Sequence, residues 1–161
     1  MRFGKILFWV LGILYLSAFP VLRAQEEPVR VILTVLAASN EGSDFNLDND
    51  AHRDKLIQLF SYTAYQQIDQ SQVSLNHTEF RTIPLLDGYE LGLTLQGQEG
   101  KNHLIRALID KGSEQHLDTV LSIPKGESNR RTGGIGKPGV VFLGGPPTAK
   151  GDLVIVVEVQ D

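Results

Sequence analysis

The chain has 161 residues, with 15 lysines and arginines against 19 acidic residues and no cysteine. A balance this acidic argues against non-specific nucleic-acid binding, which needs an excess of positive charge. The lack of cysteine excludes disulfides, thiolate metal sites, thiol nucleophiles and a lipid-modified amino-terminal cysteine.

Residues 1–24 have the three-part pattern of a secretory signal peptide. Two basic residues precede an apolar run at 6–18, and the segment ends at Ala24. The run is shorter than the roughly 20 residues that span a bilayer as a helix. We therefore expect export to the periplasm or out of a bacterial cell, with cleavage near Ala24 and membrane contact only through this segment. The alternative is an uncleaved anchor that extends through Leu22.

Removal of that segment leaves 12 basic and 19 acidic residues, a net charge of about −7. We expect residues 25–161 to form a single β-rich α+β domain, because about 140 residues suffice to bury one hydrophobic core. A chain without disulfides must take its stability from that core.

The first element expected in the mature chain is a central strand at 29–38, which is apolar on both faces and rich in β-branched residues. A polar turn follows, and then a helix from about Ala51 to Ile68, with Asp48 or Asp50 as its N-cap. The residues that recur there at helical spacing are Leu56, Leu59, Phe60 and Thr63, joined by Ile57, Ala64 and Ile68 on a broadened face.

After Asp69 the apolar pattern changes to the alternation of half-buried strands. Two further strands are expected at 140–143 and 153–159, after the alternating ones at 73–76, 91–96, 103–110 and 117–123. In one of them, Leu117, Leu121 and Ile123 oppose Asp118, Val120 and Ser122. Turn signals separate the strands at 86–88, 97–100 and 110–112. The sequence therefore predicts an α+β fold, a mainly antiparallel β-sheet or sandwich with one packed α-helix.

Gly134, Gly136 and Gly139 have the spacing of a dinucleotide-binding loop. Such a loop must open a helix, whereas Gly139 precedes an expected strand and then Gly-Gly-Pro-Pro at 144–147, which cannot continue a helix. Arg131 also stands where a phosphate loop needs its first glycine. We expect no nucleotide and no other cofactor.

Residues 44–50 imitate the start of a calcium loop, but Asn49 replaces its glycine and Lys55 its bidentate glutamate. We therefore expect no calcium site. The histidines, which show no metal-ligand spacing, are His52, His77, His103 and His116. No serine-hydrolase elbow or zinc-protease motif occurs. Paired carboxylates need no fixed spacing in sequence, which leaves a hydrolase as the alternative class.

Tyr62 and Tyr65 lie three residues apart on the expected helix. They are candidate partner-binding residues, because exposed tyrosines form aromatic contact surfaces. The other interpretation is that they seal the edge of the interface between helix and sheet.

A long segment without regular structure is expected at 125–139. Its cationic candidates for partner binding are Lys125, Arg130, Arg131 and Lys137. Long irregular segments are often functional, and arginine pairs carboxylate or phosphate through two bonds. We expect an envelope protein or an anionic envelope component as the partner, with a solvated strand connection as the alternative.

Three parts of the chain, at 38–40, at 59–65 and at 144–153 with its Gly-Gly-Pro and Gly-Asp-Leu, together resemble small exported bacterial proteins of unknown function. The last part is similar to the closing segments of secretin-type outer-membrane channel proteins, although the chain lacks their length and their membrane-crossing strands. The resemblance implies a role in envelope assemblies and assigns no site. We expect an exported, non-enzymatic binding or assembly module, with a small periplasmic hydrolase as the alternative.

Overall fold

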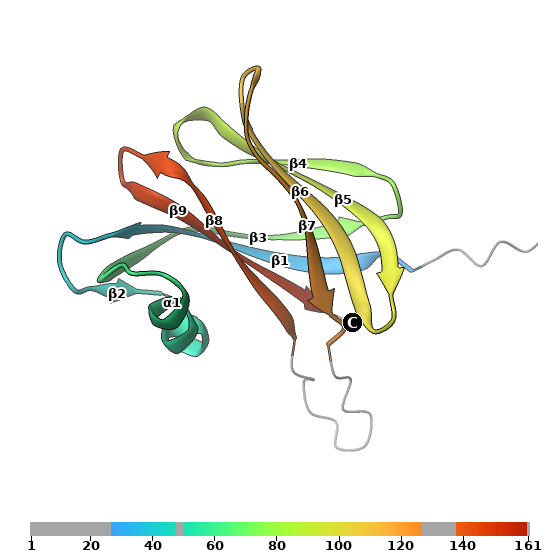
Figure 1. Cartoon of the computed structure of the whole chain (residues 1–161), viewed down its shortest axis with the longest axis horizontal. Coiled ribbons are helices and arrows are strands. Elements are labelled where there is room, and N and C mark those ends of the chain that lie inside the picture. Colours follow the sequence, from blue (N-terminus) through green and yellow to red (C-terminus); the bar gives the residue numbers. More distant parts are fainter. Residues whose placement is uncertain (1–26, 48–49, 127–137, 161) are drawn as a thin grey trace, which may run out of the picture.

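The computed structural model describes residues 27–47, 50–126 and 138–160, and these build two β-sheets packed face to face (Figure 1). The five-stranded sheet contains β1 (Val29–Ser39), β2 (Phe45–Asn46), β3 (Ala64–Leu75), β8 (Gly139–Thr148) and β9 (Gly151–Gln160). The four-stranded sheet contains β4 (Phe80–Pro84), β5 (Tyr89–Glu99), β6 (Asn102–Lys111) and β7 (Glu114–Pro124). The helical elements are η1 (Asp50–His52), α1 (Arg53–Leu59) and η2 (Leu86–Gly88).

The strand order is β2-β3-β1-β9-β8 in the five-stranded sheet and β4-β5-β6-β7 in the four-stranded sheet. These strands pair in antiparallel fashion except for the short parallel pair of β2 with β3. The predicted fold class, α+β and mainly antiparallel with one packed α-helix, is confirmed. The strands not foreseen are β2, β4 and the part of β3 from Ala64 to Gln72.

The inter-sheet core is built from alternate side chains of the two facing sheets, because successive residues of a strand point to opposite sides. On β1, Val31, Leu33 and Val35 point toward the four-stranded sheet, and on β5, Leu91 and Leu93 point back. All five are buried. The alternation in the sequence therefore identifies the inner face of each sheet.

A second apolar group, the outer cluster, lies on the opposite face of the five-stranded sheet. Its buried members are Leu36, Ala38, Leu56, Tyr65, Val154 and Val156. The connection from β1 to β3, which carries β2 and α1, lies over this face, on the side away from the four-stranded sheet (Figure 1). Both faces of β1 and β9 are covered there, which is why 29–38 and 153–159 are apolar on both faces.

The predicted helix at 51–68 is wrong in its second half. α1 ends at Leu59, Phe60 is already extended with φ −126° and ψ 142°, and β3 begins at Ala64. In β3 the backbone pairs with β1, and Ile68 packs against the inter-sheet core. Tertiary pairing of this kind overrides local helix propensity.

The predicted start of the helix also differs from the structure. The N-cap is His52 instead of Asp48 or Asp50, and its side chain makes no capping hydrogen bond. Within α1 only Leu56 is buried, and Leu59, expected on the packed face, is 58% exposed. A helix of seven residues has room for one anchoring side chain on its packed face.

Candidate functional site

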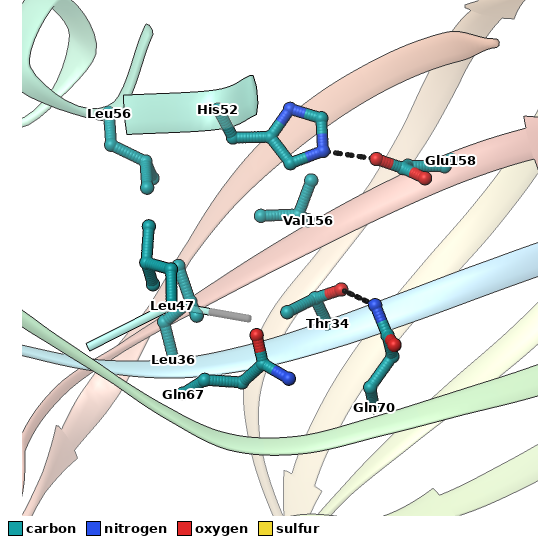
Figure 2. A pocket seen from close by; sticks show the side chains of 9 residues that line it. All are labelled: Thr34, Leu36, Leu47, His52, Leu56, Gln67, Gln70, Val156 and Glu158. Atoms are coloured by element: carbon teal, nitrogen blue, oxygen red, sulfur yellow. Dashed lines mark hydrogen bonds and ion pairs between the residues drawn. The ribbon is translucent and has the colours of Figure 1, made fainter. Parts of the chain in front are cut away.

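The outer face of the five-stranded sheet becomes polar beyond the outer cluster (Figure 2). There the Nε2 of His52, on η1, bonds to the Oε1 of Glu158 on β9. Gln70 on β3 donates to the hydroxyl of Thr34 on β1, with 3.1 Å between Nε2 and Oγ1. These two pairs edge a hollow of about 30 Å³. The remaining lining residues are Leu36, Leu47, Leu56, Gln67 and Val156.

This hollow can hold a water molecule but is too small for a substrate. The imidazole of His52 is held on one side by the carboxylate of Glu158 and packs edge-on against Phe142, at 5.7 Å between ring centroids. No cluster of three or more acidic, histidine or cysteine side chains suited to a metal ion is found in the described part of the chain. The His52–Glu158 pair therefore fastens η1 to β9.

A larger groove, of about 240 Å³, lies where the edge strands β7 and β8 diverge (Figure 1). The strands touch at Gly139, where a Cβ atom would lie 1.7 Å from the carbonyl oxygen of Pro124. Further along, His116 and Leu117 of β7 face residues 144–147 of β8 across the groove. The Gly-Gly-Pro-Pro segment is thus part of an edge strand, and the described residues that line the groove beside it include no Asp, Glu, Lys or Arg.

The outer face of the four-stranded sheet has no described helix or strand lying over it (Figure 1). Direct pairing across the strands places Phe80, Thr94, Arg106 and Val120 in one row. Phe80 and Val120, at the two ends of this row, are 56% and 49% exposed. The ring of Phe80 leans over Gly92, where a Cβ atom would lie 2.4 Å from it. We call this surface the open face.

An ion pair lies in the middle of the open face. The guanidinium of Arg106 donates from Nε to Oδ1 of Asp118 at 2.8 Å and from Nη2 to Oδ2 at 2.6 Å. These hydrogen bonds hold the pKa of the Asp118 carboxyl below its usual range, and the carboxylate in turn raises the pKa of Arg106. Both groups are charged at neutral pH and offset each other.

The two candidate tyrosines are neighbours, with 6.2 Å between ring centroids, but on different elements from those expected. Tyr65 lies on β3, is 1% exposed, and donates its hydroxyl hydrogen to the carbonyl oxygen of Leu56 at 3.2 Å. Tyr62 precedes β3, and its hydroxyl donates to Oδ2 of Asp152 at 2.5 Å. That hydrogen bond raises the pKa of Tyr62, and burial raises that of Tyr65. Tyr65 therefore has no exposed surface to offer a partner.

Lys125 directly follows β7 at the end of the sandwich where β5 turns into β6. Its amide donates to the carbonyl oxygen of Lys101 at 2.8 Å, and its Nζ donates to Oε1 of Gln98 at 2.7 Å. Two exposed lysines are thus neighbours at this end. Outside the described residues lie Arg130, Arg131 and Lys137.

Two further sequence patterns fall partly outside the described residues. Gly134 and Gly136 lie there, whereas Gly139 opens β8, so the element after these glycines is a strand, as predicted. In the segment 44–50, which imitates a calcium loop, the centre forms β2, and Lys55 lies in α1.

The open face was only partly visible in the sequence. In the alternation of its strand, Val120 falls on the same side as polar residues, which indicated that this apolar residue is exposed. Phe80 gave no such signal, because β4 was not predicted. His52 and Glu158 are 106 residues apart, and nothing local links them.

No protein-family model matches this chain, and no curated protein or solved structure shows a significant match to it. In the part of the chain that the structure describes, no helix is both long and apolar enough to cross a membrane. The functional argument therefore depends on the geometry of the surfaces above.

Proposed function

We propose that this protein is an exported envelope protein that acts as a non-enzymatic binding or assembly module. The observation that carries the proposal is the open face, where Phe80 and Val120 expose about half of their surface. Single exposed apolar residues are common, but here two large ones lie with the half-buried Leu108 on one sheet face that no described element covers, which favours a surface for a partner. The partner is an envelope protein.

The composition of the open face favours a protein partner. Cores of protein interfaces are enriched in aromatic residues and arginine, and few of their charges are unpaired. The open face presents Phe80 and Val120 around Arg106, whose charge is offset by Asp118. A nucleic acid or an anionic polymer would instead select a face with free positive charge.

The location in the envelope rests on the signal-peptide pattern of residues 1–24, which lie outside the described residues. Intact-mass measurement of the protein recovered from the producing cell tests it. The expected mass corresponds to a chain that begins at Gln25. A species in the membrane fraction that retains Met1 would favour the uncleaved anchor.

Photo-crosslinking in the native envelope tests the binding surface. A photoreactive residue at Thr94, in the middle of the open face, is expected to capture a defined envelope protein identified by mass spectrometry. The matched control places the same residue at Gln72, which is exposed on the outer face of the five-stranded sheet. Equal capture at both positions, or none at Thr94, would count against the proposal.

A second candidate partner, an anionic envelope component, is favoured by Lys101 and Lys125, which lie together at one end of the sandwich. Vesicles with anionic head groups provide the probe. Lys101→Gln combined with Lys125→Gln is expected to weaken co-sedimentation, and added salt to mimic the loss, since exposed charges are screened. Unchanged co-sedimentation would remove these lysines from the proposal.

The alternative class, a small periplasmic hydrolase with dispersed carboxylates, needs acidic side chains that converge on a hollow large enough for a substrate group. The hollow beside Glu158, of about 30 Å³, accepts a water molecule and not a substrate group, and the described residues that line the larger groove include no Asp or Glu. This geometry makes the binding module the better supported of the two.

A further inference from the structure

The open face has a pattern that matches itself. Its central row runs Phe80, Thr94, Arg106, Val120 across β4, β5, β6 and β7. The exposed apolar residues stand at the two ends, and the polar residues stand between them. A surface of this kind can pair with a copy of itself through a twofold axis, in which residue i contacts j and j contacts i.

We propose that the partner of the open face is a second copy of this chain, related by a twofold axis parallel to the strands. This inference rests on the proposed function and names the partner of the same surface. The axis places β4 of one copy over β7 of the other, and β5 over β6. Phe80 then packs on Val120 of the partner subunit, and Thr94 faces Arg106 of the partner subunit.

The neighbouring row fits the same arrangement. Thr82, Gly92, Leu108 and Asp118 are direct neighbours across the strands. The axis brings the half-buried Leu108 of the partner subunit over Gly92, where it meets the ring of Phe80 that leans across the glycine. Above Gly92, the side chain that Leu108 of the partner subunit contacts is therefore the ring of Phe80, which adds an apolar contact to this row.

Charge favours this axis over one that crosses the strands at the same row. An axis running across the strands through that row would lay each strand over its own counterpart, so that Arg106 would face Arg106 of the partner subunit. Like charges that face each other across an interface are unfavourable. With the axis parallel to the strands, Arg106 faces Thr94 of the partner subunit and keeps its own pair with Asp118.

The size of the face sets the strength of the contact. Four strands at their normal spacing place β4 and β7 about 14 Å apart. A stable interface buries about 800 Å² of surface on each partner. A face only four strands wide offers less area than that. The dimer is therefore weak, and we expect it to form in the range of about 10 µM to 1 mM.

Sedimentation velocity of the purified protein over that range tests the association. The mean mass of the unaltered protein is expected to rise toward that of a dimer. Phe80→Glu and Val120→Glu should each remain monomeric, whereas Gln72→Glu, on the outer face of the other sheet, should associate like the unaltered protein. A monomer at every concentration, or loss of association only in the Gln72 variant, would overturn the proposal.

Crosslinking tests the direction of the axis, because the chain has no cysteine of its own. Thr94→Cys places its two Cα atoms about 11 Å apart across the proposed dimer, and because both side chains point into the interface the thiols are within reach of a short bismaleimide. Thr82→Cys, on the edge strand, places its two Cα atoms about 17 Å apart. We expect crosslinked dimer from the first variant only. Crosslinking through position 82 would overturn the parallel axis.

These results separate the inference from the proposed function. A monomeric protein whose Thr94 photo-crosslinks to a different envelope protein would end the second-copy proposal and leave the binding module standing. A monomer that captures nothing at Thr94 would end both.

Discussion

The outer faces of the two sheets share an alternating strand pattern but differ in what covers them. The long connection from β1 to β3 folds back over the five-stranded sheet and carries Leu56 and Tyr62 into the outer cluster. We call this connection, which contains β2, η1 and α1, the cover. The strands of the four-stranded sheet are joined by short turns, such as those at Gly100 and Gly112, which are too short to lie over a sheet face. Among the described residues, connection length therefore decided which face is covered and which is left open.

The outward-facing residues of the strands differ between the two faces in the same way. On the covered face, Leu36, Val154 and Val156 are buried on the side that points away from the inter-sheet core. On the open face, the corresponding outward positions hold Thr94 and Arg106, with apolar residues only at the ends of the row. The following variants disturb one face or the other, in order of decreasing expected effect on stability.

Leu56→Ala removes the only buried side chain of α1 and leaves a cavity in the outer cluster. We expect a loss of about 2–5 kcal/mol in the free energy of unfolding, measured by urea denaturation. Ile57→Ala, at a neighbouring position that is 51% exposed, is the matched control and should cost much less. Similar losses for the two variants would mean that the cover does not belong to the folded core.

Tyr62→Phe removes the hydrogen bond to Asp152 that holds the end of the cover against β9. We expect a loss of about 1 kcal/mol at neutral pH, with Tyr89→Phe as the control. Because the folded-state pKa of Tyr62 is raised above 10.0, its contribution is complete below about pH 10 and is lost as the pH rises through the raised value. The difference in free energy of unfolding between the unaltered protein and the variant should therefore become smaller in strong alkali. A difference that stays constant would show that the hydroxyl contributes little.

Arg106→Gln removes the cation that lowers the pKa of Asp118 on the open face. A lowered carboxyl pKa contributes stability above its unfolded value of about 4, and this contribution is lost as the pH falls through the folded value. NMR titration of the Asp118 carboxyl should show a low pKa that moves up in the variant. An unchanged titration would mean that the pair does not persist in solution.

Val120→Thr leaves the shape of the side chain nearly the same on a surface that no described helix or strand covers. We expect the free energy of unfolding to change by less than about 0.5 kcal/mol. Val156→Thr, a matched change in the outer cluster, should cost clearly more because Val156 is buried. Equal effects would show that the open face is covered in the isolated chain.

Much of the fold could be read from the sequence, because strand alternation and turn residues are local signals. The positions of β5, β6 and β7 follow from two-residue periodicity, their turns follow from turn residues, and β9 is an apolar run without that alternation. The open face was harder to predict. Val120 was visible as an apolar residue on the polar side of its strand, whereas Phe80 lies on an edge strand of five residues, which is too short for a clear alternation.

Only the tertiary structure decided the segment from Ala64 to Ile68. Local spacing there suits a helix, yet pairing with β1 draws it into β3 and turns Tyr65 from a helix surface into the buried outer cluster. The His52–Glu158 pair, the divergence of β7 from β8 and the open face were likewise settled by contacts between distant parts of the chain. The physical reason is that periodicity records which side of an element is apolar, whereas the surface that meets it is chosen by packing across the whole molecule.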